Sequence, residues 1–409
     1  MGEKAKSSSA EPARKEHILS GLTVAACLVL LIYIFTDSGW GQLFDPLATL
    51  LQISLSKVRL LYLLWTIGYL PGTLMGGILL DHYGPRLVFL GAALLVPGGL
   101  SLFLLCLLHP HLAPFLLLLL FPAIAGVGGG VIEVSTNGLI SSAYSDRRGM
   151  MLNLFNALYP LGAMLLALID AGLFVFFHND PFPALFFTIG FSAVATTSVF
   201  AVPQTYRIKN CPETLQETFK NIPTLLPVLA PVMLVMMLTT GMSASLHTWS
   251  PTYLHLTFHA QADVAAVLTA VIWATAASGR LGAAWLITCI GSWKMAMLSL
   301  IVSLLGLILL LFSANSIIAT GAIALSSLGL APTFSTFLTI GGERTERTAG
   351  SVTGLLLFAS GLFTIGCSWL FGFLLGTLQP FWPILFCSLL ACASLIIAWR
   401  LRPTHTNKS

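Results

Sequence analysis

Residues 76–86 read Gly-Gly-Ile-Leu-Leu-Asp-His-Tyr-Gly-Pro-Arg and separate two long apolar runs. Gly84 can adopt backbone conformations that other residues avoid, and Pro85 cannot continue a helix, so the stretch predicts a chain reversal of only a few residues. Asp81 ends the preceding helix and Arg86 begins the next one. The two charges can therefore pair or can cap neighbouring helix ends, although a plain tight turn with solvated charges explains the same residues.

The runs on either side of this turn belong to a strongly apolar chain. Of its 409 residues 56% are hydrophobic, and the mean hydropathy is +0.91. Only 8% are Asp, Glu, Lys or Arg, whereas soluble domains carry about 25% charged residues. This composition excludes a soluble enzyme, a disordered chain and a coiled-coil fibre.

Polar residues, Gly and Pro divide the chain into twelve apolar runs, each close to the roughly 20 residues that a spanning helix needs. The predicted fold is an all-α integral membrane protein with 12 transmembrane helices in two six-helix halves. The predicted divisions are an N-terminal tail at 1–17, a first bundle at 18–202, a polar central loop at 203–222, a second bundle at 223–400 and a tail at 401–409.

The positions of the basic residues predict the orientation. With the N-terminus inside, 17 of the 19 Lys and Arg residues fall on the cytoplasmic side. Cytoplasmic loops carry such an excess, so we expect both termini and the central loop in the cytoplasm and the protein in the cell membrane. The net charge of +4 is scattered along the chain, which does not indicate a nucleic-acid partner.

The turn resembles the signature loop of the major facilitator superfamily, G-x-x-x-D-R-x-G-R-R, with two basic residues of that pattern replaced. The matching residues are Gly77, Asp81, Gly84 and Arg86. A weaker echo without the acid lies about two hundred residues later, at 279–294, and contains Arg280. The resemblance implies that Asp81 and Arg86, with Arg280, form a cytoplasmic gate that latches the two halves in the outward-facing state.

Glu133 lies inside an apolar run, where a charge costs a few kcal/mol. Lipid disfavours the charged form of a carboxyl, so Glu133 has the behaviour that a proton-coupling group needs. Asn137 follows one turn later, and Asn153 and Asn156 lie one turn apart on the next helix. Such groups can bind a hydroxylated ligand, but they can equally bond one another between helices.

This segment is similar to the fucose–proton symporter family and related sugar and metabolite permeases. The shared pattern is a Gly-rich helix at 126–130, then Glu-x3-Asn, then Leu-Asn-x2-Asn. The resemblance implies that Glu133 takes part in proton coupling and that the asparagines shape the site. The family has a second membrane acid in helix one, and Asp37 and Asp45 flank that place here. The five residues of 126–130 also superficially match a dinucleotide loop, but their apolar run favours close helix packing.

Two tryptophans are further candidates for substrate binding. Trp249 and Trp273 can stack on a sugar ring, and an interfacial aromatic belt explains them equally well. Trp249 is followed by Ser250 and Pro251, which predicts a break of that helix near its external end.

The expected protein is a secondary active transporter and not an enzyme. It would move a small polar solute, a sugar or related metabolite, by proton symport and alternating access, as a monomer in the bilayer without cofactor or metal. An uncoupled facilitator or a drug or metabolite efflux permease is one rival. A membrane sensor or a membrane-embedded transferase is a rival of another class, but the gaps between runs are too short for the domain or catalytic group it needs.

Overall fold

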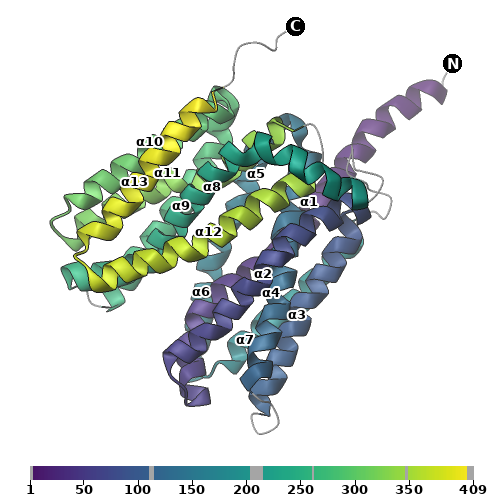
Figure 1. The fold of residues 1–409 in the computed structure, drawn as a ribbon. Coiled ribbons are helices and arrows are strands. Elements are labelled where there is room, and N and C mark those ends of the chain that lie inside the picture. The colour runs from purple at the N-terminus through teal and green to yellow at the C-terminus, as the bar shows by residue number, and fades with distance from the viewer. Residues whose placement is uncertain (1–2, 110–114, 203–214, 260–261, 346–348, 403–409) are drawn as a thin grey trace. The chain divides into compact units, whose positions relative to one another are not determined.

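The computed structural model describes residues 3–109, 115–202, 215–259, 262–345 and 349–402. This part of the chain is helical and contains no strand (Figure 1). Twelve segments in it are long and apolar enough to cross a membrane, as predicted. The α-helices are α1 (Glu3–Leu51), α2 (Leu55–Tyr83), α3 (Pro85–Leu108), α4 (Phe115–Ala143), α5 (Arg148–Asn156), α6 (Leu158–Phe176), α7 (Phe182–Thr196), α8 (Leu215–Phe258), α9 (Ala262–Ile290), α10 (Ser292–Leu311), α11 (Ser316–Glu343), α12 (Ala349–Thr377) and α13 (Phe381–Arg400).

The helices group into two compact units. Unit 1 comprises Met1–Ala143, Leu165–Glu213 and Thr348–Ser351, and unit 2 comprises Tyr144–Met164, Thr214–Arg347 and Val352–Ser409. The limits of the two predicted bundles stay a prediction. Most of the predicted central loop lies outside the described residues, and α8 begins at Leu215.

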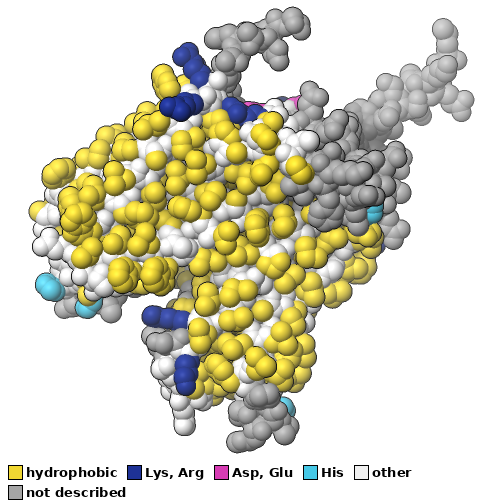
Figure 2. Space-filling model, in the orientation of Figure 1, with side chains coloured by type: hydrophobic (Ala, Val, Ile, Leu, Met, Phe, Trp, Pro, Cys, Tyr) yellow, Lys and Arg dark blue, Asp and Glu magenta, His cyan; other side chains and the backbone are white. Residues whose placement is uncertain are grey.

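The side chains that cover the helices suit a lipid solvent. Figure 2 shows hydrophobic side chains over most of the visible face, with few Lys or Arg side chains among them. Large apolar side chains such as Val175 and Phe176 are 81% and 77% exposed. An exposed apolar surface of this extent would aggregate in water, and the chain is a multi-pass integral membrane protein.

The fifth apolar run forms two helices, α5 and α6, interrupted at Ala157. Pro160 has no N–H, and its ring collides with the carbonyl of Asn156, four residues earlier. The run is long enough to span the membrane, but because of Pro160 it is not one continuous helix.

The predicted break at Pro251 is wrong, because α8 continues through Pro251 to Phe258. The proline removes the usual donor to the carbonyl of His247. The Ser250 hydroxyl donates to that carbonyl instead, at 3.3 Å. A local side-chain donor thus replaces the missing backbone bond at this position.

Close helix contacts recur at matched positions of the two halves. A β-carbon on Gly72 would collide with the carbonyl of Val127, and one on Gly279 would collide with the carbonyl of Leu328. The same correspondence holds for two further pairs, Gly99 with Gly306 and Gly128 with Gly329. Since the later glycines meet the counterparts of the atoms that the earlier ones meet, the second half repeats the first.

The turn glycines repeat as well. Gly84 before α3 has φ 79° and ψ 169°, and Gly291 before α10 has φ 83° and ψ 163°. Only glycine adopts this backbone region readily, which confirms the predicted role of Gly84 in the tight turn.

We predict that Gly84→Ala and Gly291→Ala each destabilise the protein by about 1–3 kcal/mol, because the β-carbon is strained in this conformation. Thermal unfolding in detergent measures the effect. Gly282→Ala is the control, since its β-carbon would meet no atom within 4 Å in α9. Equal melting temperatures for all three variants would contradict the prediction.

Candidate functional site

In unit 1, Glu133 lies on α4 with 9% of its surface exposed. The Tyr69 hydroxyl of α2 donates a hydrogen bond to its carboxylate oxygen Oε2. A second acid is bonded in the same manner, because the Tyr62 hydroxyl donates to Oδ1 of Asp37 at 3.4 Å. Each of these two acids thus faces a tyrosine of α2.

Stacked rings connect these two acids. The four rings have neighbouring centroids 5.8–6.1 Å apart and planes within 10–20° of each other, and they belong to Tyr33, Tyr62, Trp65 and Tyr69. We call these rings, together with Asp37 and Glu133, the Glu133 cluster. It draws its members from α1, α2 and α4.

The sequence interpretation did not assign Asp37 to a site. Its placement depends on how α1 packs against α2, which hydropathy does not specify. A signal existed in the sequence, since Tyr62, Trp65 and Tyr69 follow each other at helical spacing on one face of α2. Asp45 lies among the residues whose side chains the structure does not describe.

The glycines of α4 allow Glu133 to lie close to the aromatic face of α2. A β-carbon on Gly126 would collide with the carbonyl of Trp65, and one on Gly130 would collide with the carbonyl of Tyr69. Without side chains at these positions, the backbones of α4 and α2 approach closely. The glycine-rich segment therefore serves helix packing, as predicted.

The three predicted asparagines each bond their own helix. Their amide nitrogens donate to the carbonyl four residues earlier at 2.9 Å, from Asn137 to Glu133, from Asn153 to Gly149 and from Asn156 to Leu152. All three are buried, Asn137 in unit 1 and the other two in unit 2. Oδ1 of Asn153 is buried without a hydrogen-bond partner. Their predicted contact with a substrate stays a prediction.

In unit 2, Arg280 of α9 joins three other elements. Its Nε donates to the carbonyl of Ala331 at 3.0 Å, its Nη1 donates to the carbonyl of Asn156, and its guanidinium lies 6.0 Å from the ring centroid of Phe334. Arg280 stands ten residues before the end of α9 at Ile290. The sequence interpretation put it at the cytoplasmic helix end, because one charge barely lowers the hydropathy of a long run.

The bond to Asn156 has a local cause. Pro160 cannot donate to the carbonyl of Asn156, and inside a membrane an unpaired carbonyl costs several kcal/mol. Arg280 supplies the missing donor and so ties the break between α5 and α6 to α9.

Aromatic residues extend this group along α9. The rings of His247 and Trp273 lie 4.5 Å apart, and the ring of Tyr159 lies 6.2 Å from that of Trp273. Nε2 of His247 is 2.7 Å from the hydroxyl oxygen of Ser327. We call the set Asn156, Tyr159, His247, Trp273, Arg280 and Ser327 the Arg280 cluster.

The other predicted tryptophan is used for packing. Nε1 of Trp249 donates to the carbonyl of Ser368 at 2.9 Å, and its ring fills the space beside Gly372 on α12. Because both the Nε1–H group and the ring of Trp249 have partners within unit 2, we leave Trp249 out of the proposed site.

Asp81 caps the beginning of α12. Its carboxylate is 3% exposed and accepts from the backbone N–H of Gly350 at 3.0 Å and of Ser351 at 2.7 Å, and from the Ser351 hydroxyl at 2.6 Å. A negative charge at a helix N-terminus is stabilised by the helix dipole. The sequence left open whether Asp81 pairs with Arg86 or caps a neighbouring helix end, and in the structure it caps α12. The guanidinium of Arg86 instead lies 5.7 Å from the ring centroid of Phe200.

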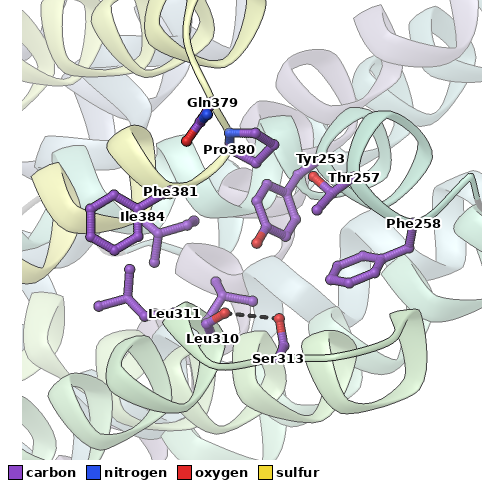
Figure 3. Close-up of a pocket in the computed structure, with 10 residues that line it drawn as sticks. All are labelled: Tyr253, Thr257, Phe258, Leu310, Leu311, Ser313, Gln379, Pro380, Phe381 and Ile384. Atoms are coloured by element: carbon purple, nitrogen blue, oxygen red, sulfur yellow. Dashed lines mark hydrogen bonds between the residues drawn. The ribbon is translucent and has the colours of Figure 1, made fainter.

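A cavity of about 250 Å³ lies at the ends of three helices of unit 2 (Figure 3). Its walls include Phe258, the last residue of α8, Leu311, the last of α10, and Phe381, the first of α13. None of the residues drawn in Figure 3 is charged, and none belongs to either cluster. We therefore do not place the solute there.

A model of the Major Facilitator Superfamily matches residues 18–367. The chain belongs to that superfamily. Together with the fold, this membership makes it a facilitator-type transporter and confirms the predicted family.

Solved structures share the fold across nearly the whole of this facilitator. FucP, the fucose:proton symporter of E. coli, in its outward conformation has a TM-score of 0.80 at 12% identity, covering 95% of this chain and 100% of that one. The proton:xylose symporter XylE has a TM-score of 0.78 at 14% identity, covering 95% and 97%. The human organic anion transporter MFSD10 has a TM-score of 0.74 at 16% identity, covering 94% and 99%. These identities show a common fold and do not select a solute.

One curated relative shares sequence over a limited segment. The mouse protein "Sodium-dependent glucose transporter 1A" is 28% identical over 129 residues, which is 32% of this facilitator. The match spans 29% of that relative's length.

We predict that the role of Arg280 in holding Asn156 depends on Pro160. Arg280→Ala leaves the Asn156 carbonyl without its donor and should destabilise the protein by about 1–3 kcal/mol. In a Pro160→Ala background the restored N–H can serve that carbonyl, so the same substitution should cost less. A double-mutant cycle on unfolding in detergent measures the coupling, expected at about 0.5–3 kcal/mol. Additive effects would show that Arg280 does not serve the freed carbonyl.

Proposed function

We propose that this facilitator is a secondary active transporter that carries a small polar solute, a sugar or related metabolite, together with protons by alternating access. The proposal places it as a monomer in the cell membrane with both termini in the cytoplasm. The observation that carries it is the Glu133 cluster, in which a membrane-buried carboxyl is bonded by the hydroxyl of Tyr69.

A carboxyl at this depth is suited to bind and release a proton. Its charged form costs several kcal/mol in lipid, so the protonated form is accessible and a change in hydration can move the equilibrium. The Tyr69 hydroxyl can donate to the carboxylate and accept from the protonated acid, because a phenol does both. Asp37, bonded by Tyr62 on the same aromatic stack, is the proposed second proton carrier.

Asp81 is the proposed gate residue. Its bonds to Gly350 and Ser351 hold the first turn of α12 to α2. The unit composition supports this role, since Thr348–Ser351 group with unit 1 while the remainder of α12 groups with unit 2. Alternating access would make and break this cap in each cycle.

We predict that Glu133→Gln abolishes uptake driven by an inward proton gradient and preserves exchange of solute at equal pH, because the amide binds no proton. Uptake of a labelled sugar and metabolite panel into proteoliposomes is the measurement. Glu343→Gln is the matched control, since this exposed acid at the end of α11 accepts from Ser292. Equal proton-driven uptake by wild type and Glu133→Gln would refute coupling through Glu133.

Sodium is the alternative coupling ion, favoured by the name of the mouse relative. The same proteoliposomes should be tested with a sodium gradient at equal pH. Uptake that follows sodium and ignores the proton gradient would replace the proton in this proposal.

We predict that Asp81→Asn weakens the cap on α12, because a neutral amide loses the attraction to the helix N-terminus and offers one acceptor in place of two. Ser351→Ala removes a single bond and should have the smaller effect. Cysteines introduced near the predicted cytoplasmic face should become at least several-fold more accessible to a thiol reagent in Asp81→Asn. Unchanged labelling in Asp81→Asn would show that this residue serves stability and not gating.

A further inference from the structure

One end of unit 2, where α10 begins and where α11 and α13 end, carries a group of exposed cations. They are Lys294, Arg344, Arg400 and Arg402. Figure 2 shows Lys and Arg side chains gathered at the end from which the C-terminus leaves, with hydrophobic side chains beside them. Among the described residues of these three helix ends the one acid is Glu343, so the surface is net positive.

Direct contacts hold the three helix ends together. The guanidinium of Arg402, just after α13, lies 5.8 Å from the ring centroid of Trp293 on α10. The rings of Trp293 and Trp399 lie 5.9 Å apart. Nη2 of Arg344, just after α11, donates to the carbonyl of Leu401 at 2.8 Å. The four cations and the two tryptophans thus share one surface, which we call the basic patch.

The two tryptophans place the basic patch at the level of lipid headgroups. Nε1 of Trp293 donates to the carbonyl of Ala398 at 3.0 Å, which fixes its ring between α10 and α13. Trp399 is 58% exposed at the end of α13. Tryptophan is enriched at this depth of a membrane, because its ring is apolar and its N–H group is polar.

Exposed apolar side chains continue from the basic patch along both helices. α10 packs against α13. Each helix exposes large apolar residues at helical spacing, and these are 39–61% exposed: Leu298, Ile301 and Leu305 on α10, and Leu389 and Ile396 on α13. A cationic surface followed by apolar strips matches a molecule with an anionic head and hydrocarbon chains.

One contact of the basic patch recurs in unit 1 and is explained by packing. The matched turns before α3 and α10 make Arg86 the counterpart of Trp293. The guanidinium of Arg86 lies 5.7 Å from the ring centroid of Phe200, as that of Arg402 lies over Trp293. Since an arginine and an aromatic ring meet at this joint in both units, Arg402 serves the fold.

Lys294 and Arg400 have no such role. Their side chains are exposed and make no hydrogen bond, ion pair or ring contact within the described part of the chain. The counterpart of Lys294 in unit 1 is Leu87, so the repeated backbone plan does not require a cation there. Both charges are therefore available to a ligand.

We propose that the basic patch binds an anionic phospholipid, with the phosphate on Lys294 and Arg400 and the acyl chains along α10 and α13. Ammonium and guanidinium groups form charge-assisted hydrogen bonds to phosphate oxygens. A basic residue near an anionic membrane surface contributes about fivefold in affinity. This site is separate from the Glu133 and Arg280 clusters and does not depend on the solute or on the coupling ion.

Lipid binding to the purified full-length protein in neutral detergent tests the proposal. Native mass spectrometry would compare phosphatidylglycerol with phosphatidylcholine of the same acyl chains, and phosphatidylglycerol should bind about tenfold or more tightly. The double variant Lys294→Gln, Arg400→Gln should lose most of this preference while melting as the wild type does, because neither side chain has a partner in the fold.

The matched control is Lys57→Gln, Arg59→Gln, which removes two exposed cations from α2 in unit 1 and the same net charge. It should keep the preference. Equal binding of the two lipids, a preference that survives Lys294→Gln, Arg400→Gln, or an equal loss in both double variants would overturn the proposal.

A soluble phosphate is the competing ligand for the same charges. sn-Glycerol 3-phosphate has the charged part of the lipid without its acyl chains, so it should not displace phosphatidylglycerol at equal concentration. Displacement would show a site for a soluble phosphate and would overturn the lipid assignment.

Brominated acyl chains locate the bound lipid, because bromine quenches tryptophan fluorescence on contact. Brominated phosphatidylglycerol should quench more than brominated phosphatidylcholine. This excess should vanish in Trp293→Phe, Trp399→Phe. It should remain in the control Trp285→Phe, Trp369→Phe, whose tryptophans are 70% and 67% exposed on α9 and α12. An excess that persists without Trp293 and Trp399 would place the lipid elsewhere and refute the site.

Discussion

Hydrocarbon offers no hydrogen-bond partner, so each carbonyl that a proline frees in a membrane helix must find a donor within the protein. Three such carbonyls have identifiable donors: Asn156 is served by Arg280, Ala93 by Thr196 and His247 by Ser250. The local result differs among the three. α3 continues through Pro97 with a donor from α7, and α8 continues through Pro251 with a donor from the same turn, whereas the helix is interrupted at Ala157 before Pro160.

The same constraint governs what polar side chains in the spans can do. Asn137, Asn153 and Asn156 all return their amide nitrogens to their own helices, so their presence in apolar runs does not by itself mark a solute site. Glu133 and Arg280 are different, because their side chains bond groups of other helices: the Tyr69 hydroxyl bonds Glu133, and Arg280 bonds the carbonyls of Ala331 and Asn156. These two residues are therefore the strongest candidates for a site.

Hydropathy was sufficient to predict twelve membrane spans and an all-α membrane fold, because lipid requires long apolar runs of nearly fixed length. The turn at Gly84 followed from residue chemistry alone. The continuity of a helix at proline did not follow, because a proline alone does not decide it: α3 continues through Pro97 and α8 through Pro251, whereas α5 ends at Asn156 before Pro160. Asp37 escaped assignment because its partner Tyr62 is on another helix.

The internal repeat makes the placement of charge informative. Gly128 and Gly329 are matched, so the position of Glu133 corresponds to Phe334 in the second half. Gly72 and Gly279 are matched too, so Arg280 corresponds to Thr73 in the first half. Two halves built on one backbone plan thus carry an acid in one and a cation in the other. The repeated backbone plan therefore does not extend to these charged side chains, and each half supplies partners for its own charge, Tyr69 for Glu133 and the carbonyls of Ala331 and Asn156 for Arg280.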